Sequence, residues 1–136
     1  MSTLMSSRTI SISIACPAEA VYDFIADPEH LPAWAPGLAR AVRRDGDHWI
    51  LDREGGSIPI EFAPRNPFGV VDHRLTVRPD LTVLSHLRVI PNGGGAEVML
   101  TLFQPDEAGM GQFEADAAIV EDDLQTLKRL LEAEET

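Results

Sequence analysis

The feature that most constrains this chain is a helical pattern at its C-terminal end. Beyond Gly109 the apolar residues recur at spacings of four or three, at Phe113, Ala117, Val120, Leu124, Leu127 and Leu131. This spacing puts them on one stripe of a helix. The chain between Gly37 and Gln104 is instead typical of strands separated by turns. A single helix after such strands must bury its stripe against the sheet, and a curved sheet around one helix favours a cavity between them.

The N-terminal part predicts one strand and two short helices. In Thr9–Ala15 isoleucines alternate with Thr and Ser, which indicates a strand with one buried face. Pro17 suits the first turn of a helix. That helix ends at Asp27-Pro28, because the residue before a proline is pushed out of the helical region. A second short helix is predicted over Glu29–Trp34.

Six further strands are predicted before the last helix. Gly, Pro, Asn and Asp separate the apolar runs at short, regular intervals, which is typical of an antiparallel meander. The expected strands are Leu38–Arg44, His48–Arg53, Ser57–Ala63, Val70–Arg78, Leu81–Ile90 and Glu97–Phe103. The order β-α-α-β6-α predicts an α+β helix-grip fold, a curved antiparallel sheet wrapped around a long C-terminal helix. At 136 residues the chain is expected to be a single domain, 1–136.

Composition excludes several classes of partner and site. A net charge of −11 opposes binding to nucleic acid or to an anionic membrane surface. No stretch approaches the ~20 apolar residues of a membrane span, and Met1–Arg8 lacks the apolar run of a signal peptide. A cytoplasmic, soluble protein is therefore expected. The single cysteine, Cys16, cannot form an intramolecular disulfide and is interpreted as a core residue.

No metal site or other cofactor is predicted. The four histidines, His30, His48, His73 and His86, are scattered, and neither an HxxxH nor a CxxC spacing occurs.

The whole chain resembles the START/Bet v 1-like superfamily, also described as the SRPBCC or polyketide cyclase-like, helix-grip group. The most specific part is Pro17–Trp34, in which a proline after a strand is followed by a helix, an Asp-Pro break and a tryptophan. The closing helix with Val120, Leu124, Leu127 and Leu131 also fits. This superfamily includes lipid and sterol carriers, aromatase/cyclases, quinone-binding proteins and chaperone activators, so the fold alone does not choose a function. No catalytic motif of the family is found in the chain.

His73 is the first candidate site residue. In Val70–Arg78 one face carries Val71, His73, Leu75 and Val77, and the other carries Asp72, Arg74, Thr76 and Arg78. The second set is the solvent face, so His73 is predicted to point to the concave, apolar side. A buried imidazole needs a hydrogen-bond partner. It is interpreted either as a hydrogen-bonded core residue or as a ligand-contacting acid or base.

Ser85 is predicted to lie near His73. The same alternation in Leu81–Ile90 turns Val83, Ser85, Leu87 and Val89 inward. A symmetric turn at Arg78–Leu81 places His73 opposite Ser85–Leu87. A nucleophilic Ser–His pair is disfavoured, because no orienting acid shares the face and no oxyanion loop is visible. A simple buried hydrogen bond is the preferred interpretation.

Three aromatic residues complete the candidate ligand-binding set. Trp34 follows the short helix that borders the cavity mouth in proteins of the superfamily, so it either stacks on a flat ligand or caps the core. Tyr22 lies beside the apolar face of the first helix and could offer its hydroxyl to a pocket. Trp49 shares a strand face with Arg53, which is either a rim charge or a partner for a ligand carboxylate.

The acidic residues of the last helix are interpreted as stabilising and solubilising charges. Glu114, Asp116, Glu121, Asp122 and Asp123 lie early on it, where negative charge suits the helix dipole.

Three functions remain open from the sequence. The leading hypothesis is binding of a small hydrophobic or aromatic ligand, of lipid, quinone or polyketide type, between the sheet and the last helix. The second is a polyketide cyclase/aromatase-like enzyme with His73 as acid/base. The third is a module resembling the chaperone activators that binds a basic protein partner. Whether the protein is a homodimer, and whether it catalyses a reaction, is left open.

Overall fold

The computed structural model describes residues 4–104 and 109–134 and has the predicted element order. Its helices are α1 (Ala18–Ile25), α2 (Leu31–Trp34) and α3 (Met110–Glu134), and a 3-10 turn η1 (Pro28–His30) precedes α2. Its strands are β1 (Ser7–Ile14), β2 (Ala41–Asp45), β3 (His48–Arg53), β4 (Gly56–Phe62), β5 (His73–Arg78), β6 (Leu81–Asn92) and β7 (Gly95–Phe103).

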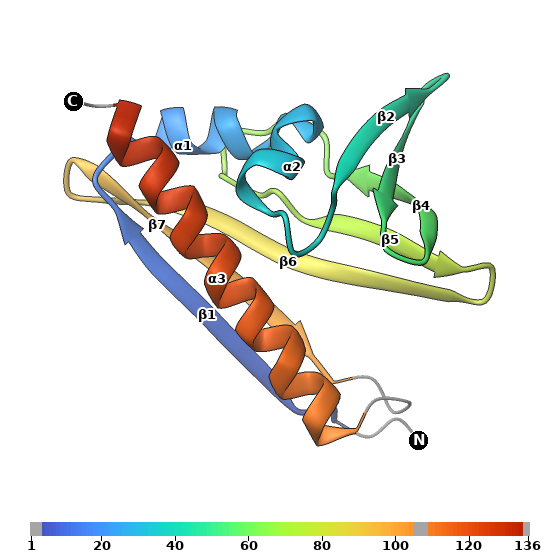
Figure 1. The fold of residues 1–136 in the computed structure, drawn as a ribbon. Helices are drawn as coiled ribbons and strands as arrows, with labels where there is room; N and C mark the ends of the chain where they lie inside the picture. The colour runs from blue at the N-terminus through green and yellow to red at the C-terminus, as the bar shows by residue number, and fades with distance from the viewer. Residues whose placement is uncertain (1–3, 105–108, 135–136) are drawn as a thin grey trace.

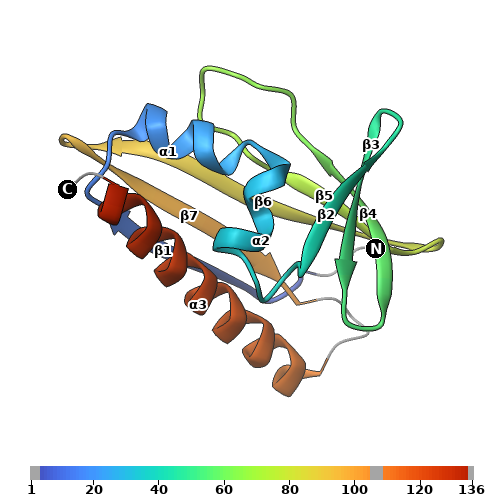
Figure 2. The ribbon, with the colours of Figure 1, turned by 45° about the horizontal axis from the view of Figure 1, so that its top comes forward.

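The seven strands form one antiparallel sheet in the order β1-β7-β6-β5-β4-β3-β2. The sheet curves around α3, and all three α-helices lie on its concave side (Figures 1 and 2). The N-terminal strand β1 pairs along its length with β7, from Ser7 opposite Phe103 to Ile14 opposite Ala96. This is the helix-grip α+β fold that the sequence predicts.

The apolar stripe of α3 forms one side of the core, as expected. Phe113, Ala117, Leu124, Leu127 and Leu131 are all buried, and Leu127 is fully enclosed. Inward residues of the strands, among them Ile14, Leu51, Leu87 and Val98, form the other side. Cys16 is also buried, in agreement with its interpretation as a core residue.

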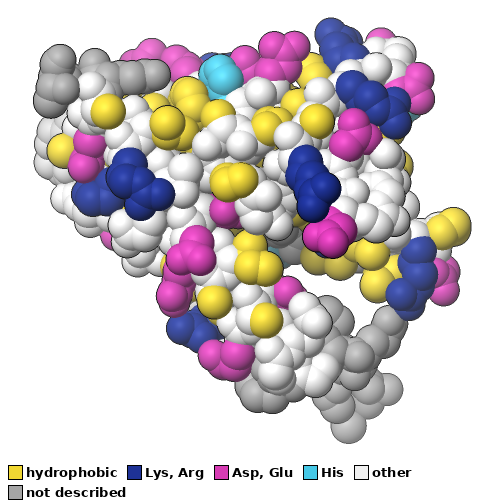
Figure 3. All heavy atoms as spheres, in the orientation of Figure 1, with side chains coloured by type: hydrophobic (Ala, Val, Ile, Leu, Met, Phe, Trp, Pro, Cys, Tyr) yellow, Lys and Arg dark blue, Asp and Glu magenta, His cyan; other side chains and the backbone are white. Residues whose placement is uncertain are grey.

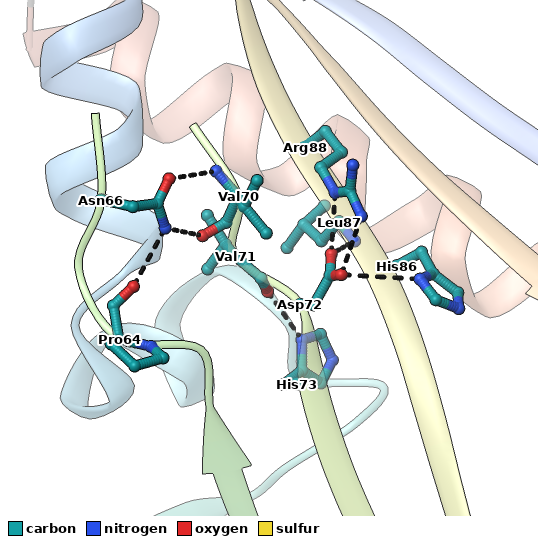
Figure 4. Close-up of polar contacts among 9 residues, drawn as sticks. All are labelled: Pro64, Asn66, Val70, Val71, Asp72, His73, His86, Leu87 and Arg88. Carbon is teal, nitrogen blue, oxygen red and sulfur yellow. Dashed lines mark hydrogen bonds and ion pairs between the residues drawn. The ribbon is translucent and has the colours of Figure 1, made fainter. Parts of the chain in front are cut away.

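The predicted strand Val70–Arg78 begins only at His73, so the expected boundary is wrong by three residues. The preceding segment 63–72 runs beside β6 without becoming a full strand: Val71 N donates to Leu87 O at 2.8 Å, and Val89 N donates to Gly69 O at 2.9 Å. The Asn66 side chain fixes this segment, because its Oδ1 accepts from Val70 N and its Nδ2 donates to Val70 O (Figure 4). These side-chain bonds replace the strand ladder.

Two other boundaries differ for a physical reason. Pro91, predicted to lie in a turn, is inside β6 opposite Ala96. A proline is tolerated there because segment 63–72 bonds to that side of β6 only as far as Val89, so no strand pairs with it at Pro91. Residues 38–40, predicted to begin a strand, form a turn instead, since Leu38 N and Ala39 N both donate to Ala35 O.

Candidate functional site

A cavity of about 330 Å³ lies between the sheet and α3. Its wall is mostly apolar, and the main apolar residues are Leu38, Leu75, Val77, Val83, Leu100, Leu102, Ile119, Val120 and Leu124. Figure 3 shows a hollow between α3 and the strands beside it, along which hydrophobic side chains gather. A small number of polar groups enter this wall, and these decide what the cavity can bind.

His73 lies on the cavity side of β5, as predicted, and is only 4% exposed. Its Nδ1 is 3.2 Å from the carbonyl oxygen of Val71 (Figure 4). Because a carbonyl only accepts, we assign the ring proton to Nδ1, which leaves Nε2 as an acceptor. Burial lowers the pKa of His73, although the Val71 carbonyl and the Asp72 charge act in the opposite direction. The imidazole is therefore neutral near neutral pH.

Ser85 is the direct cross-strand neighbour of His73 and also lines the cavity. The alternation in β5 and β6 thus predicted this juxtaposition correctly. The simple hydrogen bond expected between the two side chains is not made, because the His73 ring stacks on Phe62 and turns Nδ1 back to its own strand. Within residues 4–104 and 109–134 no group hydrogen-bonds the Ser85 hydroxyl, which leaves it available to a ligand.

Trp34 lies at the end of α2 and is 3% exposed. It belongs both to the core and to the cavity wall, so the core-capping alternative is observed, and stacking on a ligand stays a prediction. Its indole Nε1–H is buried, and no acceptor for it exists in the described part of the chain. A buried donor without a partner costs roughly 1–3 kcal/mol.

Asp123 is a polar cavity residue that the sequence interpretation missed. Its exposed fraction is 7%, and its Oδ1 accepts from Gly37 N at 3.1 Å. Burial, with a smaller contribution from the neighbouring Asp122 charge, raises the pKa of Asp123 to about 6 despite that hydrogen bond. Its interpretation as a solubilising charge was wrong, because the side chain is buried. The sequence feature that could have indicated this burial is the spacing of Asp123, which lies three residues after Val120 and four before Leu127 on the buried stripe.

The raised pKa predicts how Asp123→Asn changes stability with pH. The folded state favours the protonated form of Asp123. The protonated side chain therefore makes its full contribution to the free energy of unfolding below pH 3.8, the ordinary pKa, and this contribution is lost as the pH rises through about 6. Near pH 7.5 the variant is expected to be about 2 kcal/mol more stable than the wild type, with little difference near pH 4. Urea unfolding at both pH values measures this.

Asp122→Asn is the matched control for that measurement. Asp122 is the exposed neighbour of Asp123 on α3, so its substitution removes the same charge without touching the cavity. A free-energy difference between Asp123→Asn and wild type that stays constant from pH 4 to pH 7.5 would contradict the prediction.

Arg53 and Asp116 bring further charge to the cavity. Arg53 is exposed at the end of β3 and lines the mouth, where the described residues offer it no ion-pair partner. The rim position that the sequence allowed for Arg53 is thus the observed one. Asp116 lies on α3 two turns before Asp123, and its Oδ1 accepts from Gln112 Nε2 at 2.8 Å.

Tyr22 and Trp49 are not among the residues that line this cavity. The Tyr22 hydroxyl accepts from Asn66 N at 2.9 Å, and the Arg65 guanidinium lies over its ring. Tyr22 thus anchors the segment 63–72. The ring of Trp49 lies on β3, where the Arg44 guanidinium is 5.3 Å from its centroid. Of the five predicted ligand-binding residues, the structure brings together His73, Ser85 and Trp34.

Among the described residues, no helix is both long and apolar enough to cross a bilayer. The same residues contain no group of three or more His, Cys, Asp or Glu side chains placed to hold a metal ion.

Solved structures with the same fold cover nearly the whole chain. XoxI from Bacillus cereus is 20% identical, with a TM-score of 0.78 over 97% of this chain and 99% of that one. The Aha1 dimer from Colwellia psychrerythraea is 16% identical, with a TM-score of 0.73 over 94% and 97%. A START superfamily protein from Mycobacterium smegmatis is 17% identical, with a TM-score of 0.69 over 93% and 97%. A search of curated proteins found no match.

The curved sheet, the enclosed helix and the cavity between them define a helix-grip domain of the START/Bet v 1-like class. Within this class the chain belongs to the family described as polyketide cyclase/dehydrase and lipid transport, whose model matches residues 5–132. Membership supports a ligand-binding domain.

Proposed function

We propose that this protein binds a small hydrophobic or aromatic molecule, of lipid, quinone or polyketide type, in the cavity between the sheet and α3. The observation that carries the proposal is the polar chemistry of an otherwise apolar wall. The Ser85 hydroxyl and the His73 Nε2 lack partners among the described residues and belong to side chains that line the cavity, and the buried Nε1–H of the adjoining Trp34 is also unpartnered. Polar groups inside proteins normally have a partner from the protein, from ordered water or from a ligand.

Binding is expected to change the fluorescence of Trp34 and leave that of Trp49 unchanged. In a Trp49→Phe variant, Trp34 is the sole tryptophan, and a flat neutral probe such as 2-naphthalenemethanol should quench its emission with saturation because the ring forms the cavity wall. Trp34→Phe, which keeps only Trp49, is the matched control. No saturable change in the first variant, together with an empty protein in native mass spectrometry and organic extraction, would overturn the proposal.

An enzymatic function is the second candidate, and the adjacency of His73 and Ser85 at the cavity favours it. A neutral imidazole with Nε2 available can accept a proton from a bound substrate. No carboxylate of the described residues hydrogen-bonds His73, so a Ser-His-Asp arrangement is not formed. If His73→Ala binds the ligand but loses all turnover, the enzyme is supported; unchanged turnover would refute a role for His73 as acid/base.

The partner proposed for this protein is thus a small molecule, and the proposed location is the cytoplasm. We also propose that the protein is a homodimer, since the similar Aha1 protein is described as a dimer. Light scattering at several protein concentrations tests this.

A further inference from the structure

One carboxylate in the cavity wall is only partly compensated. Asp123 is 93% buried, the complement of its 7% exposure, and its single hydrogen-bond donor among the described residues is Gly37 N. A carboxylate has about four acceptor positions on its two oxygens. No described residue donates a hydrogen bond to Oδ2, and the Asp123 side chain lines the cavity. Buried charges in proteins are normally paired, since an unpaired one is costly.

Gly37 packs so closely against this carboxylate that no side chain fits at its position. A Cβ at Gly37 would lie 2.5 Å from Ile119 Cγ2, 3.1 Å from Asp123 Oδ1 and 3.2 Å from Asp123 Oδ2. The absent side chain lets the backbone N–H reach Oδ1 and lets the turn 35–40 close against α3. The carboxylate is consequently held in place rather than swinging into solvent.

The surrounding wall suits a cation. Trp34, whose aromatic ring lines the same cavity, offers a π-face that attracts positively charged groups. Asp116 adds a second carboxylate from the same helix face. The helical side of the wall therefore carries two carboxylates and an aromatic ring among its apolar residues, while the sheet side is apolar apart from His73, Ser85 and Arg53.

We propose that the ligand of this cavity is a hydrophobic amine, whose protonated nitrogen pairs with Asp123 while its apolar body fills the space against the sheet. This inference rests on the proposed function, because it names the ligand class of the same cavity. An ammonium N–H supplies the donor that Oδ2 lacks, and the ion pair forms where water is largely excluded. Arg53 at the mouth lies on a different wall, that of β3, and disfavours a second positive charge near the entrance.

Three probes of one shape test the proposal: 2-naphthylmethylamine, 2-naphthalenemethanol and 2-naphthoate. We expect the amine to bind the full chain roughly tenfold or more tightly than the alcohol, as a hydrogen bond to a charged group implies. The naphthoate is expected to bind more weakly than the alcohol. Calorimetric titration near pH 7.5 measures all three.

Asp123→Asn separates the charge from the shape of the site. Asparagine keeps an acceptor for Gly37 N but removes the negative charge. In this variant the amine should bind about as tightly as the alcohol, and the affinity for the alcohol should not change. Asp122→Asn changes the net charge equally from an exposed position and should preserve the preference. Lowering the pH to about 5 should weaken the amine alone, as Asp123 becomes protonated.

Four other ionisable side chains, His73, Arg53, Asp116 and Asp122, lie at this cavity or next to Asp123 in the chain. Burial lowers the pKa of His73 on β5, which disfavours the charged imidazole at this site. Arg53 on β3 also lines the cavity, and the amine remains protonated as a lysine side chain does. Asp116, which is hydrogen-bonded to Gln112, and Asp122 both lie on α3. The variants Asp116→Asn and Asp122→Asn measure how much each of these carboxylates contributes to the pH dependence of amine binding.

The outcomes distinguish the two proposals. If the alcohol binds and the amine binds no tighter, or if Asp123→Asn keeps the preference for the amine, the amine inference is overturned and the cavity proposal stands. If the naphthoate binds most tightly, Arg53 rather than Asp123 selects the ligand, and the inference is likewise wrong. If none of the three probes binds, both proposals fail.

Discussion

Gly69→Ala is expected to destabilise the protein by about 3 to 4 kcal/mol. Gly69 has φ +73°, a conformation that alanine adopts at a cost of roughly 1–2 kcal/mol. An added Cβ would also lie 2.0 Å from the carbonyl oxygen of Val89. Since the obstacle is backbone, the segment 63–72 must move away from β6, and the Val89 N–H bond to Gly69 O is lost. Urea unfolding gives the free-energy change.

Gly93→Ala isolates the steric part of that loss. Gly93 also has a positive φ, +59°, but nothing lies within 4 Å of an added Cβ. Its substitution should therefore cost only about 1 kcal/mol. Equal losses for the two variants would show that the close approach of segment 63–72 to β6 does not limit stability.

Leu127→Ala is expected to cost about 3 kcal/mol, because Leu127 is fully buried on α3 and its truncation leaves a void that packed neighbours cannot fill. Ile119→Ala on the same helix is the control. Ile119 is 42% exposed at the edge of the cavity, so its truncation should cost about 1 kcal/mol or less. Thermal and urea unfolding compare them, and a loss for Ile119→Ala as large as that for Leu127→Ala would contradict this account of the core.

The sequence predicts the fold well where periodicity has one physical cause. The stripe of α3 and the alternation in β5 and β6 both follow from burial of one face, so they identified Leu127, His73 and Ser85 correctly. Val77 shows that an inward position need not be a buried one. It lines the cavity, as its place on the inward face of β5 predicts, yet it is 41% exposed near the hairpin end, where the register shifts between Thr76 and Arg78.

The site depends on tertiary contacts that no local pattern encodes. Asp123 is buried because the turn at Gly37 covers it, and that turn lies far away in sequence. Tyr22 was expected to face a pocket, but the backbone N–H of Asn66 occupies its hydroxyl. In each case the deciding partner comes from a distant segment, and periodicity within one element carries no information about it.

The pairing of β1 with β7 has a consequence for how the chain reaches this structure. The hairpins from β2 to β7 join neighbours in sequence, and each can form as soon as its two strands exist. Strand β1 instead cannot pair until β7, the last strand, is present. Helix α3 then packs over β1, and Arg8 forms ion pairs with Glu114 and Glu121 of that helix. Such non-local closure is slow. During synthesis, β1 therefore emerges well before its partner β7 and is among the last elements to find its place, and the cavity forms only after α3 has been made.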